Sequence, residues 1–155
     1  MGEDARFEDA DAGPVALRAL DADDLKVISA LVQDAIFPAA EMAWDRRRRR
    51  FALLLNRFRW EDAGGQHPPE RVRAVLTIED ALAVASQGID RADPDLVLSI
   101  LALDWAPGVD GTGRITLVLA GDGAIAVDVE ALEVTLRDVT QPYVAPSGKT
   151  PSHPA

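Results

Sequence analysis

The chain has 155 residues, of which 48% are apolar and 5% aromatic, so we expect one domain with an aliphatic core. Its formal net charge of −10 argues against a general nucleic-acid binder and against adsorption to an anionic membrane. The absence of cysteine excludes disulfides, thiol catalysis and thiolate metal sites, and nothing in the sequence predicts a cofactor or a metal.

The two ends of the chain differ in composition from the rest. Residues 1–13 hold five acidic residues against one basic residue, and residues 144–155 are rich in proline. Both segments are predicted to be disordered tails, which leaves a single β-rich domain over residues 14–143. The acidic N-terminus lacks the apolar run of a signal peptide, and no apolar stretch approaches the roughly 20 residues of a membrane span. We therefore expect a cytoplasmic protein.

The first elements of this domain are a short strand over Val15–Leu20 and one amphipathic helix. Asp21 is a typical N-cap residue, and the acidic residues after it favour the positive end of the helix dipole. Pro38 is expected to end the helix, because the residue before a proline disfavours helical geometry. The apolar stripe at spacings of three and four consists of Leu25, Ile28, Leu31, Val32, Ala35 and Ile36.

After this helix every predicted element is a strand or a turn. Asp110-Gly111 and Gly121-Asp122-Gly123 are typical of hairpin turns, because such turns need residues that tolerate a positive φ. The turns are expected at 45–49, 61–69, 109–113 and 121–123. The strands are expected at Ala40–Trp44, Arg50–Trp60, Val72–Ile78, Ala81–Ala85, Leu96–Trp105, Arg114–Ala120, Ala124–Asp128 and Leu132–Val139.

One strand motif occurs twice in this region. Arg50-Phe51-Ala52-Leu53-Leu54-Leu55 returns as Arg114-Ile115-Thr116-Leu117-Val118-Leu119, and Ala81-Leu82-Ala83-Val84 returns as Ala131-Leu132-Glu133-Val134. We predict a mainly β (α+β) fold of two similar antiparallel four-stranded halves, over about residues 39–86 and 96–138. They would form a sandwich or a closed barrel with the N-terminal helix packed on it. Chance similarity between strands rich in Leu and Val is the alternative.

Two stretches of the chain are similar to a known family. The first is Leu20-Asp21-x-x-Asp24-Leu25, which enters a helix continuing to Leu31-Val32-Gln33-Asp34-Ala35. The second is Arg50-Phe51-Ala52-Leu53-Leu54-Leu55-Asn56-Arg57-Phe58-x-Trp60-Glu61. From Ala16 to about Tyr143 the chain resembles the uncharacterised DUF2948 family, found mainly in alphaproteobacteria. The resemblance implies a fold and a bacterial lineage, and it supplies no catalytic residue, cofactor or substrate.

No catalytic constellation is recognisable in the sequence. The two histidines, His67 and His153, fall in a predicted loop and a predicted tail. No serine lies in a nucleophile motif, and Asp110 and Asp122 stand beside glycines as turn-forming residues do. We therefore expect no enzyme and no metal site.

Arginine is the unusual feature of the composition, since 14 of the 16 basic residues are arginine. Five are consecutive, and Arg57 and Arg59 share one face of their strand while Arg71 and Arg73 share one face of the next. If these strands pair, the four guanidinium groups are expected to gather on one surface. They would be neutralised by the protein's own carboxylates, such as Glu61, Glu70, Glu79 and Glu133, or would bind an anionic partner. The candidate binding residues are Arg46, Arg47, Arg48, Arg49, Arg57, Arg59, Arg71 and Arg73.

The sequence favours a non-enzymatic cytoplasmic protein that binds or scaffolds other proteins. The alternative is a binder of a small anionic or phosphate-bearing ligand, or of nucleic acid, through the arginine cluster. Because the arginine-rich segments and the long loop lie in the first half, that half is the expected working surface. The sequence leaves the partner and the oligomeric state open.

Overall fold

The computed structural model describes residues 14–62, 70–90, 92–139 and 143–144, and every structural statement below concerns these residues. Except for Val144, both predicted tails lie outside them, as do His67 and His153. Among the described residues, no helix has the length and apolar character needed to cross a membrane.

The chain begins with strand β1 (Ala16–Ala19) and helix α2 (Ala22–Leu31). Asp21 caps the helix as predicted, because its side chain accepts a hydrogen bond of 2.8 Å from the backbone N–H of Asp24. Leu25, Ile28 and Leu31 are buried, so the predicted apolar stripe faces the core. The helix lies against β1 and against strand β7 (Val97–Pro107).

The predicted end of this helix is wrong. The helix stops at Leu31, Asp34 takes a positive φ of 65°, and Ile36–Pro38 form strand β2. From Ala35 to Phe37 the burial alternates, with Ala35 and Phe37 buried and Ile36 exposed, which is the period of a strand. Pairing of β2 with two other strands therefore overrides the helical spacing of its apolar residues.

The strands form a single 11-stranded sheet of order β1-β10-β5-β4-β2-β7-β8-β9-β6, with β3 paired to β4 and β11 to β5. The remaining elements are η1 (Ala39–Glu41), β3 (Met42–Asp45), β4 (Arg50–Phe58), η2 (Trp60–Asp62), β5 (Glu70–Ile78), β6 (Ala81–Gln87), β7 (Val97–Pro107), η3 (Val109–Gly111), β8 (Gly113–Leu119), β9 (Ala124–Val129), β10 (Val134–Asp138) and β11 (Tyr143–Val144). The described strands leave the sheet open, with β1 and β6 at its two ends, so they do not form the closed barrel.

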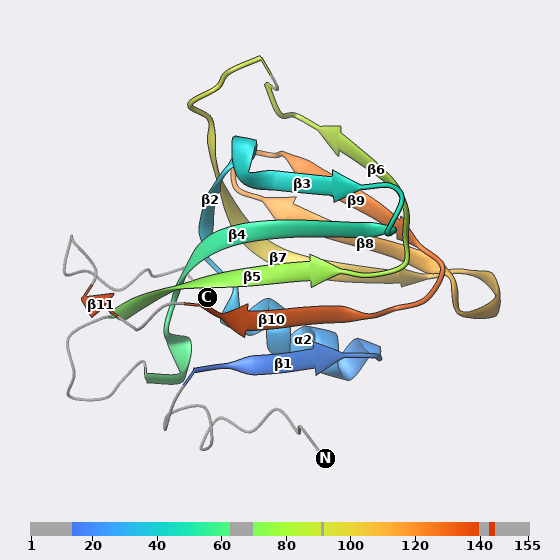
Figure 1. Cartoon of the computed structure of the whole chain (residues 1–155), viewed down its shortest axis with the longest axis horizontal. Helices are drawn as coiled ribbons and strands as arrows, with labels where there is room; N and C mark the ends of the chain where they lie inside the picture. The colour runs from blue at the N-terminus through green and yellow to red at the C-terminus, as the bar shows by residue number, and fades with distance from the viewer. Residues whose placement is uncertain (1–13, 63–69, 91, 140–142, 145–155) are drawn as a thin grey trace.

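The sheet folds back on itself into two layers. In Figure 1 strands β3, β4, β5, β10 and β1 make the front layer, while β7, β8, β9 and β6 lie behind them. Strand β2 joins the layers, because it pairs with both β4 and β7. The core between the layers is aliphatic, with buried residues such as Leu53, Leu76, Ile100 and Leu117. The mainly antiparallel β fold with one helix agrees with the prediction.

The fourth strand of each predicted half pairs with the other half. Strands β3, β4 and β5 pair in succession, and so do β7, β8 and β9. Strand β6 then pairs with β9, while β10 pairs with β5. The two halves are thus linked by an exchange of strands as well as by the β2–β7 pair.

The pairing registers correspond at the repeat positions. Ile78 lies opposite both Phe51 and Val134, while Val127 lies opposite both Ile115 and Val84. The repeated motifs equate Phe51 with Ile115 and Val84 with Val134. The pairing therefore makes Ile78 and Val127 equivalent as well.

The junction of the halves follows the same correspondence. Met42 pairs with Leu53 and Leu103 with Leu117, so the predicted repeat equates Met42 with Leu103. The same offset along the sequence equates Phe37 with Leu98, and these two residues lie opposite each other in the β2–β7 pair.

Candidate functional site

The register of β4 and β5 separates the two arginine pairs. The strands pair as predicted, but Arg57 lies opposite Val72, whereas Arg73 lies opposite Asn56 and Arg71 opposite Phe58. Because directly opposite residues share a face, Arg57 is on one face of the sheet, and Arg71 and Arg73 are on the other. The expected gathering of four guanidinium groups on one surface is therefore wrong. The sequence defined the alternation within each strand and left the register between them undetermined.

Arg57 is buried in an ion network between two carboxylates. Its guanidinium donates to Asp138 through Nε and Nη2, at 2.9 Å each, and to Glu61 through Nη1 and Nη2, at 2.9 and 2.7 Å. All three side chains are almost fully buried. Burial alone would lower the pKa of Arg57, but the hydrogen bonds that it donates to Glu61 and Asp138 outweigh burial and raise that pKa. All three guanidinium nitrogens of Arg57 therefore donate hydrogen bonds to carboxylates of the protein itself.

Arg59 is buried beside this network. Its Nη1 donates to Glu70 Oε1 at 2.8 Å, and its Nε lies 3.6 Å from Glu61 Oε2. Neighbouring Trp60 donates its indole N–H to the carbonyl of Gln33, which attaches η2 to the segment after α2. Arg57 and Arg59 are therefore neutralised by the protein's own carboxylates, which is one of the two alternatives predicted from the sequence.

Arg71 and Arg73 lie on the outer face of the front layer. Arg73 lines a cavity of about 250 Å³ together with Asn56, Glu41 and apolar residues of β2 and β4. The Nη1 atom of Arg71 is buried and has no hydrogen-bond partner among the described residues. This face carries cationic groups that the buried network does not use.

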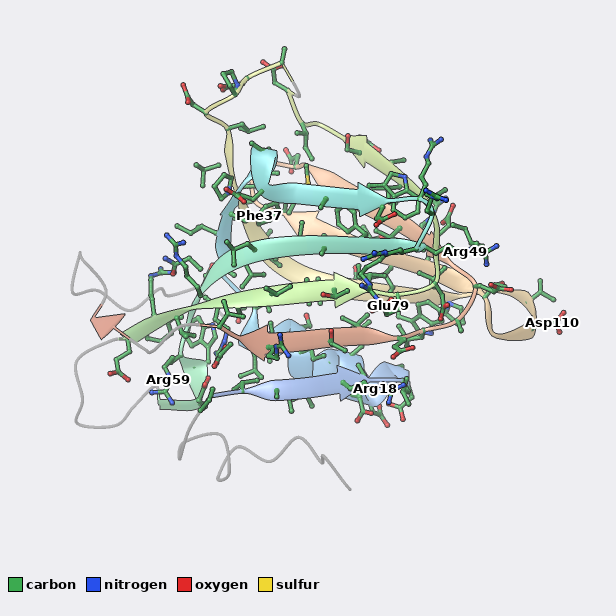
Figure 2. All side chains as sticks on the ribbon, viewed as in Figure 1. Arg18, Phe37, Arg49, Arg59, Glu79 and Asp110 are labelled. Atoms are coloured by element: carbon green, nitrogen blue, oxygen red, sulfur yellow. The ribbon has the colours of Figure 1, made fainter. Side chains whose placement is uncertain are left out.

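The arginine run forms the turn between β3 and β4. Arg49 takes a positive φ of 52°, and its side chain pairs with Glu130 at 2.8 Å. Arg50 opens β4 and pairs with Glu79 at 3.1 Å. Arg46 and Arg47 are exposed, and no ion pair joins them to another residue of the described part of the chain. Figure 2 shows Arg49 and Glu79 at one end of the strands and Arg59 at the other, so the predicted arginine residues make no single site.

An apolar groove lies between the free edges of β3 and β6, on the first half of the chain. Its volume is about 350 Å³, and we call it the β3–β6 groove. The residues that line it include Met42, Trp44, Phe51, Val84, Ser86 and Ile125. Apolar side chains of this kind suit an apolar ligand group or a protein side chain.

Exposed residues of opposite charge lie near the two ends of the β3–β6 groove. Asp93, in the loop after β6, lines the groove beside η1, and Asp95 is exposed close by. At the other end the β3–β4 turn presents Arg46 and Arg47, and the carbonyl of Arg49 accepts a hydrogen bond from the N–H of Ala81, where β6 begins. The groove is thus lined by apolar residues apart from Ser86 and Asp93, and the exposed Arg46 and Arg47 belong to the turn beyond its other end.

The outer edge of β6 is uncovered by any strand that the structure describes. Its sequence, Ala81-Leu82-Ala83-Val84-Ala85-Ser86-Gln87, has no charged residue and no proline, which are the usual protections of an exposed edge. A register shift between Ala81 and Ala83 is its one irregularity. The alternation and composition of these residues predict the strand but not its exposure, which only the absence of charged residues could have indicated.

The corresponding edges in the second half are covered. Strand β10, which the predicted repeat equates with β6, is paired along its outer edge by β1. Strand β7, which the predicted repeat equates with β3, is covered by α2, where the hydroxyl of Ser29 accepts a hydrogen bond of 2.9 Å from the N–H of Leu103. Neither β3 nor β6 has such a cover on its outer edge among the described strands.

Comparisons with known proteins give one match. The family model described as "Protein of unknown function (DUF2948)" matches residues 15–153, which is nearly the whole chain. No curated protein matches the chain, and no solved structure does.

Proposed function

Because the chain belongs to the DUF2948 family, whose description assigns no activity, we propose its function from its geometry. It acts as a non-enzymatic cytoplasmic binding protein, and its docking site for another protein is the β3–β6 groove. The observation that carries this proposal is an apolar groove of about 350 Å³ beside an uncharged, uncovered strand edge. An edge of this kind favours contact with another chain.

The groove offers contact area rather than reactive groups. The described residues that line it are mainly apolar, and the carboxylate of Asp93 is its one ionisable group. Protein interfaces have this composition at their centre, with charged groups at the rim. The arginine turn and the acidic loop supply such a rim.

Cross-linking in cells of the native host, followed by mass spectrometry, tests this function. The full chain is compared with Ser86→Trp, which fills the groove, and with Val109→Trp, which adds the same side chain at an exposed residue of η3, outside β6 and outside the groove lining. We expect the same partner with the wild type and with Val109→Trp, and its loss with Ser86→Trp. Equal recovery with Ser86→Trp, or no partner with any bait, would contradict the proposal.

A second candidate function is binding of a small anionic or phosphate-bearing ligand. It is supported by exposed Arg46 and Arg47, and by the buried Nη1 atom of Arg71 that lacks a hydrogen-bond partner among the described residues. Calorimetric titration with inorganic pyrophosphate tests it, with Arg46→Gln/Arg47→Gln and Arg71→Gln as variants and Arg114→Gln as the control. Binding that Arg114→Gln retains and one of the other variants loses would favour this candidate. No binding by the wild type at millimolar pyrophosphate would count against it.

We also propose that the two halves are copies of one ancestral unit. The matching registers support this, and so does an ion pair present in both copies. Arg50 pairs with Glu79, and Arg114 pairs with Asp128, at the positions equated by the repeat. Under this proposal the open groove and the groove filled by β1 and α2 are equivalent sites.

A further inference from the structure

We propose that the β3–β6 groove takes an extended segment of a partner protein, which adds to β6 as an antiparallel strand. The inference rests on the proposed function and specifies the form of its partner. The segment carries apolar side chains at alternate positions, a basic residue near its N-terminal end and an acidic residue near its C-terminal end.

The second half of the molecule shows how such an edge is filled. There β1 lies antiparallel to β10, with Ala19 opposite Val134 and Leu17 opposite Leu136. Ala19 is buried and Leu17 is partly buried against the core, while Ala16 and Arg18 are exposed. One apolar face of a short strand therefore covers the edge of β10, and its polar face stays in solvent.

The same arrangement fits β6. The repeat equates Val134 with Val84, and therefore Leu136 with Ser86, and both Val84 and Ser86 line the groove. A strand added to β6 would point its residues opposite Val84 and Ser86 into the groove. Because serine stands where the counterpart strand has leucine, space remains there for a larger side chain from the partner.

The charges at the ends of the groove determine the direction and composition of the segment. Strand β6 runs from the arginine turn toward the loop that carries Asp93 and Asp95. An antiparallel segment would therefore begin beside these aspartates and end beside Arg46 and Arg47. A basic residue at its start and an acidic residue at its end would meet charges of opposite sign.

A second copy of this chain suits the groove less well than a different protein does. The strand that the copy would offer, β6 itself, has no charged residue to place beside either end of the groove. Each chain also carries a net charge of −10, which opposes association of two copies at low salt. Self-association is therefore an outcome that the test must separate.

Phage display of random 12-residue peptides against the full chain provides the probe. We expect the selected peptides to share alternating apolar residues with the predicted basic and acidic ends, and to be lost when Ser86→Trp is the bait and kept with Val109→Trp. Binding should slow amide hydrogen exchange at least tenfold in residues 81–87. Selection of peptides without this pattern, or equal selection by Ser86→Trp, would overturn the inference.

N-methylation of the selected peptide then tests the backbone contacts. Two versions are compared, methylated at the odd or at the even positions, because only alternate N–H groups of an added strand face β6. One version should bind at least tenfold more weakly than the other. If both versions bind as tightly as the unmodified peptide does, the peptide does not pair with β6 as an added strand and the inference is wrong. Recovery of a cross-linked partner that requires the groove would still support the proposed function.

Two further measurements identify other occupants. Dimerisation at micromolar concentration in sedimentation, abolished by Ser86→Trp, would assign the edge to a second copy. A tenfold gain in peptide affinity on removal of residues 145–155 would assign it to the chain's own end. Either result would overturn the assignment to a partner protein, whereas a monomer with unchanged affinity supports it.

Discussion

Arg57 joins parts of the chain that are far apart in sequence. Its guanidinium holds Glu61, just after β4, and Asp138, at the end of β10. Asp138 also accepts a hydrogen bond from the N–H of Val15, so the network reaches the start of β1. Such a buried network favours the one arrangement of β1, β4 and β10 in which all three charged groups are paired. In any other arrangement a charged group would be buried without a partner.

The first prediction concerns removal of the arginine from this network. Arg57→Met leaves Glu61 and Asp138 buried without their cation, so we expect the free energy of unfolding to fall by about 3–5 kcal/mol. Urea unfolding followed by circular dichroism measures it. The control is Arg18→Met, because Arg18 forms an exposed pair with Glu133 and should contribute less than about 1 kcal/mol. Similar losses in the two variants would show that the Arg57 network adds nothing beyond a surface pair.

The second prediction is a dependence of stability on pH. Burial alone would raise the pKa of Glu61, but hydrogen bonds from Arg57 outweigh it, and the pKa lies below its ordinary value of 4.5. A depressed folded pKa means that ionised Glu61 stabilises the native state above the unfolded pKa. That contribution is lost as pH falls through the folded value.

We therefore expect Glu61→Gln to be less stable than the wild type at pH 7. The difference in free energy of unfolding should shrink as pH falls below the ordinary pKa of 4.5 and through the lower pKa of the folded state, because the wild-type carboxylate becomes protonated there. Urea unfolding of both proteins across this range checks the prediction. A constant difference at every pH would contradict it.

The residue-scale predictions succeeded where a side chain had its partner nearby in sequence. Glu61 and Glu70 were among the carboxylates named as possible internal partners of the arginines, and they pair with Arg57 and Arg59. Asp138 was missed, because its contact with Arg57 depends on β10 crossing to the other half of the molecule. Nothing in the local sequence around Asp138 indicates that crossing.

At the scale of elements, strands were predictable where one face is buried. The alternation of Val72, Ala74, Leu76 and Ile78 predicted β5, and all four side chains are buried. The hairpin turns followed from Asp-Gly chemistry, and Asp110 and Gly111 do take a positive φ. What failed was the relative placement of elements, since the register of β4 on β5 and the end of α2 depend on tertiary pairing.

The cap of α2 gives the prediction that belongs to this scale. Asp21→Ala removes the acceptor for the N–H of Asp24, and we expect a loss of about 1 kcal/mol in the free energy of unfolding. Thermal and urea unfolding measure it. Asp23→Ala is the matched control, because Asp23 lies in the same first turn and is not the cap, so its effect should be smaller. Equal losses would mean that charge near the helix end, rather than capping, is responsible.

At the scale of the whole molecule, the exchange of β6 and β10 decides how the core is assembled. The front layer takes β10 from the second half, and the rear layer takes β6 from the first. The repeated motifs predicted similar halves. The exchange was not predictable, because a strand pattern does not specify which neighbour it pairs with. The candidate groove was missed for the same reason, since β3 and β6 line it together only in the folded molecule.

This exchange predicts that neither half folds alone. A fragment of residues 1–88 would lack β10 beside β5, and a fragment of residues 89–155 would lack β6 beside β9 as well as the α2 cover of β7. Each fragment would expose strand edges and the apolar core face, so each should be unfolded by circular dichroism. Mixed in equal amounts, the fragments should associate and regain the spectrum of the intact chain, because every missing strand is then supplied. Cooperative unfolding of either fragment by itself would show that one half carries a complete core, and the exchange would then be dispensable for folding.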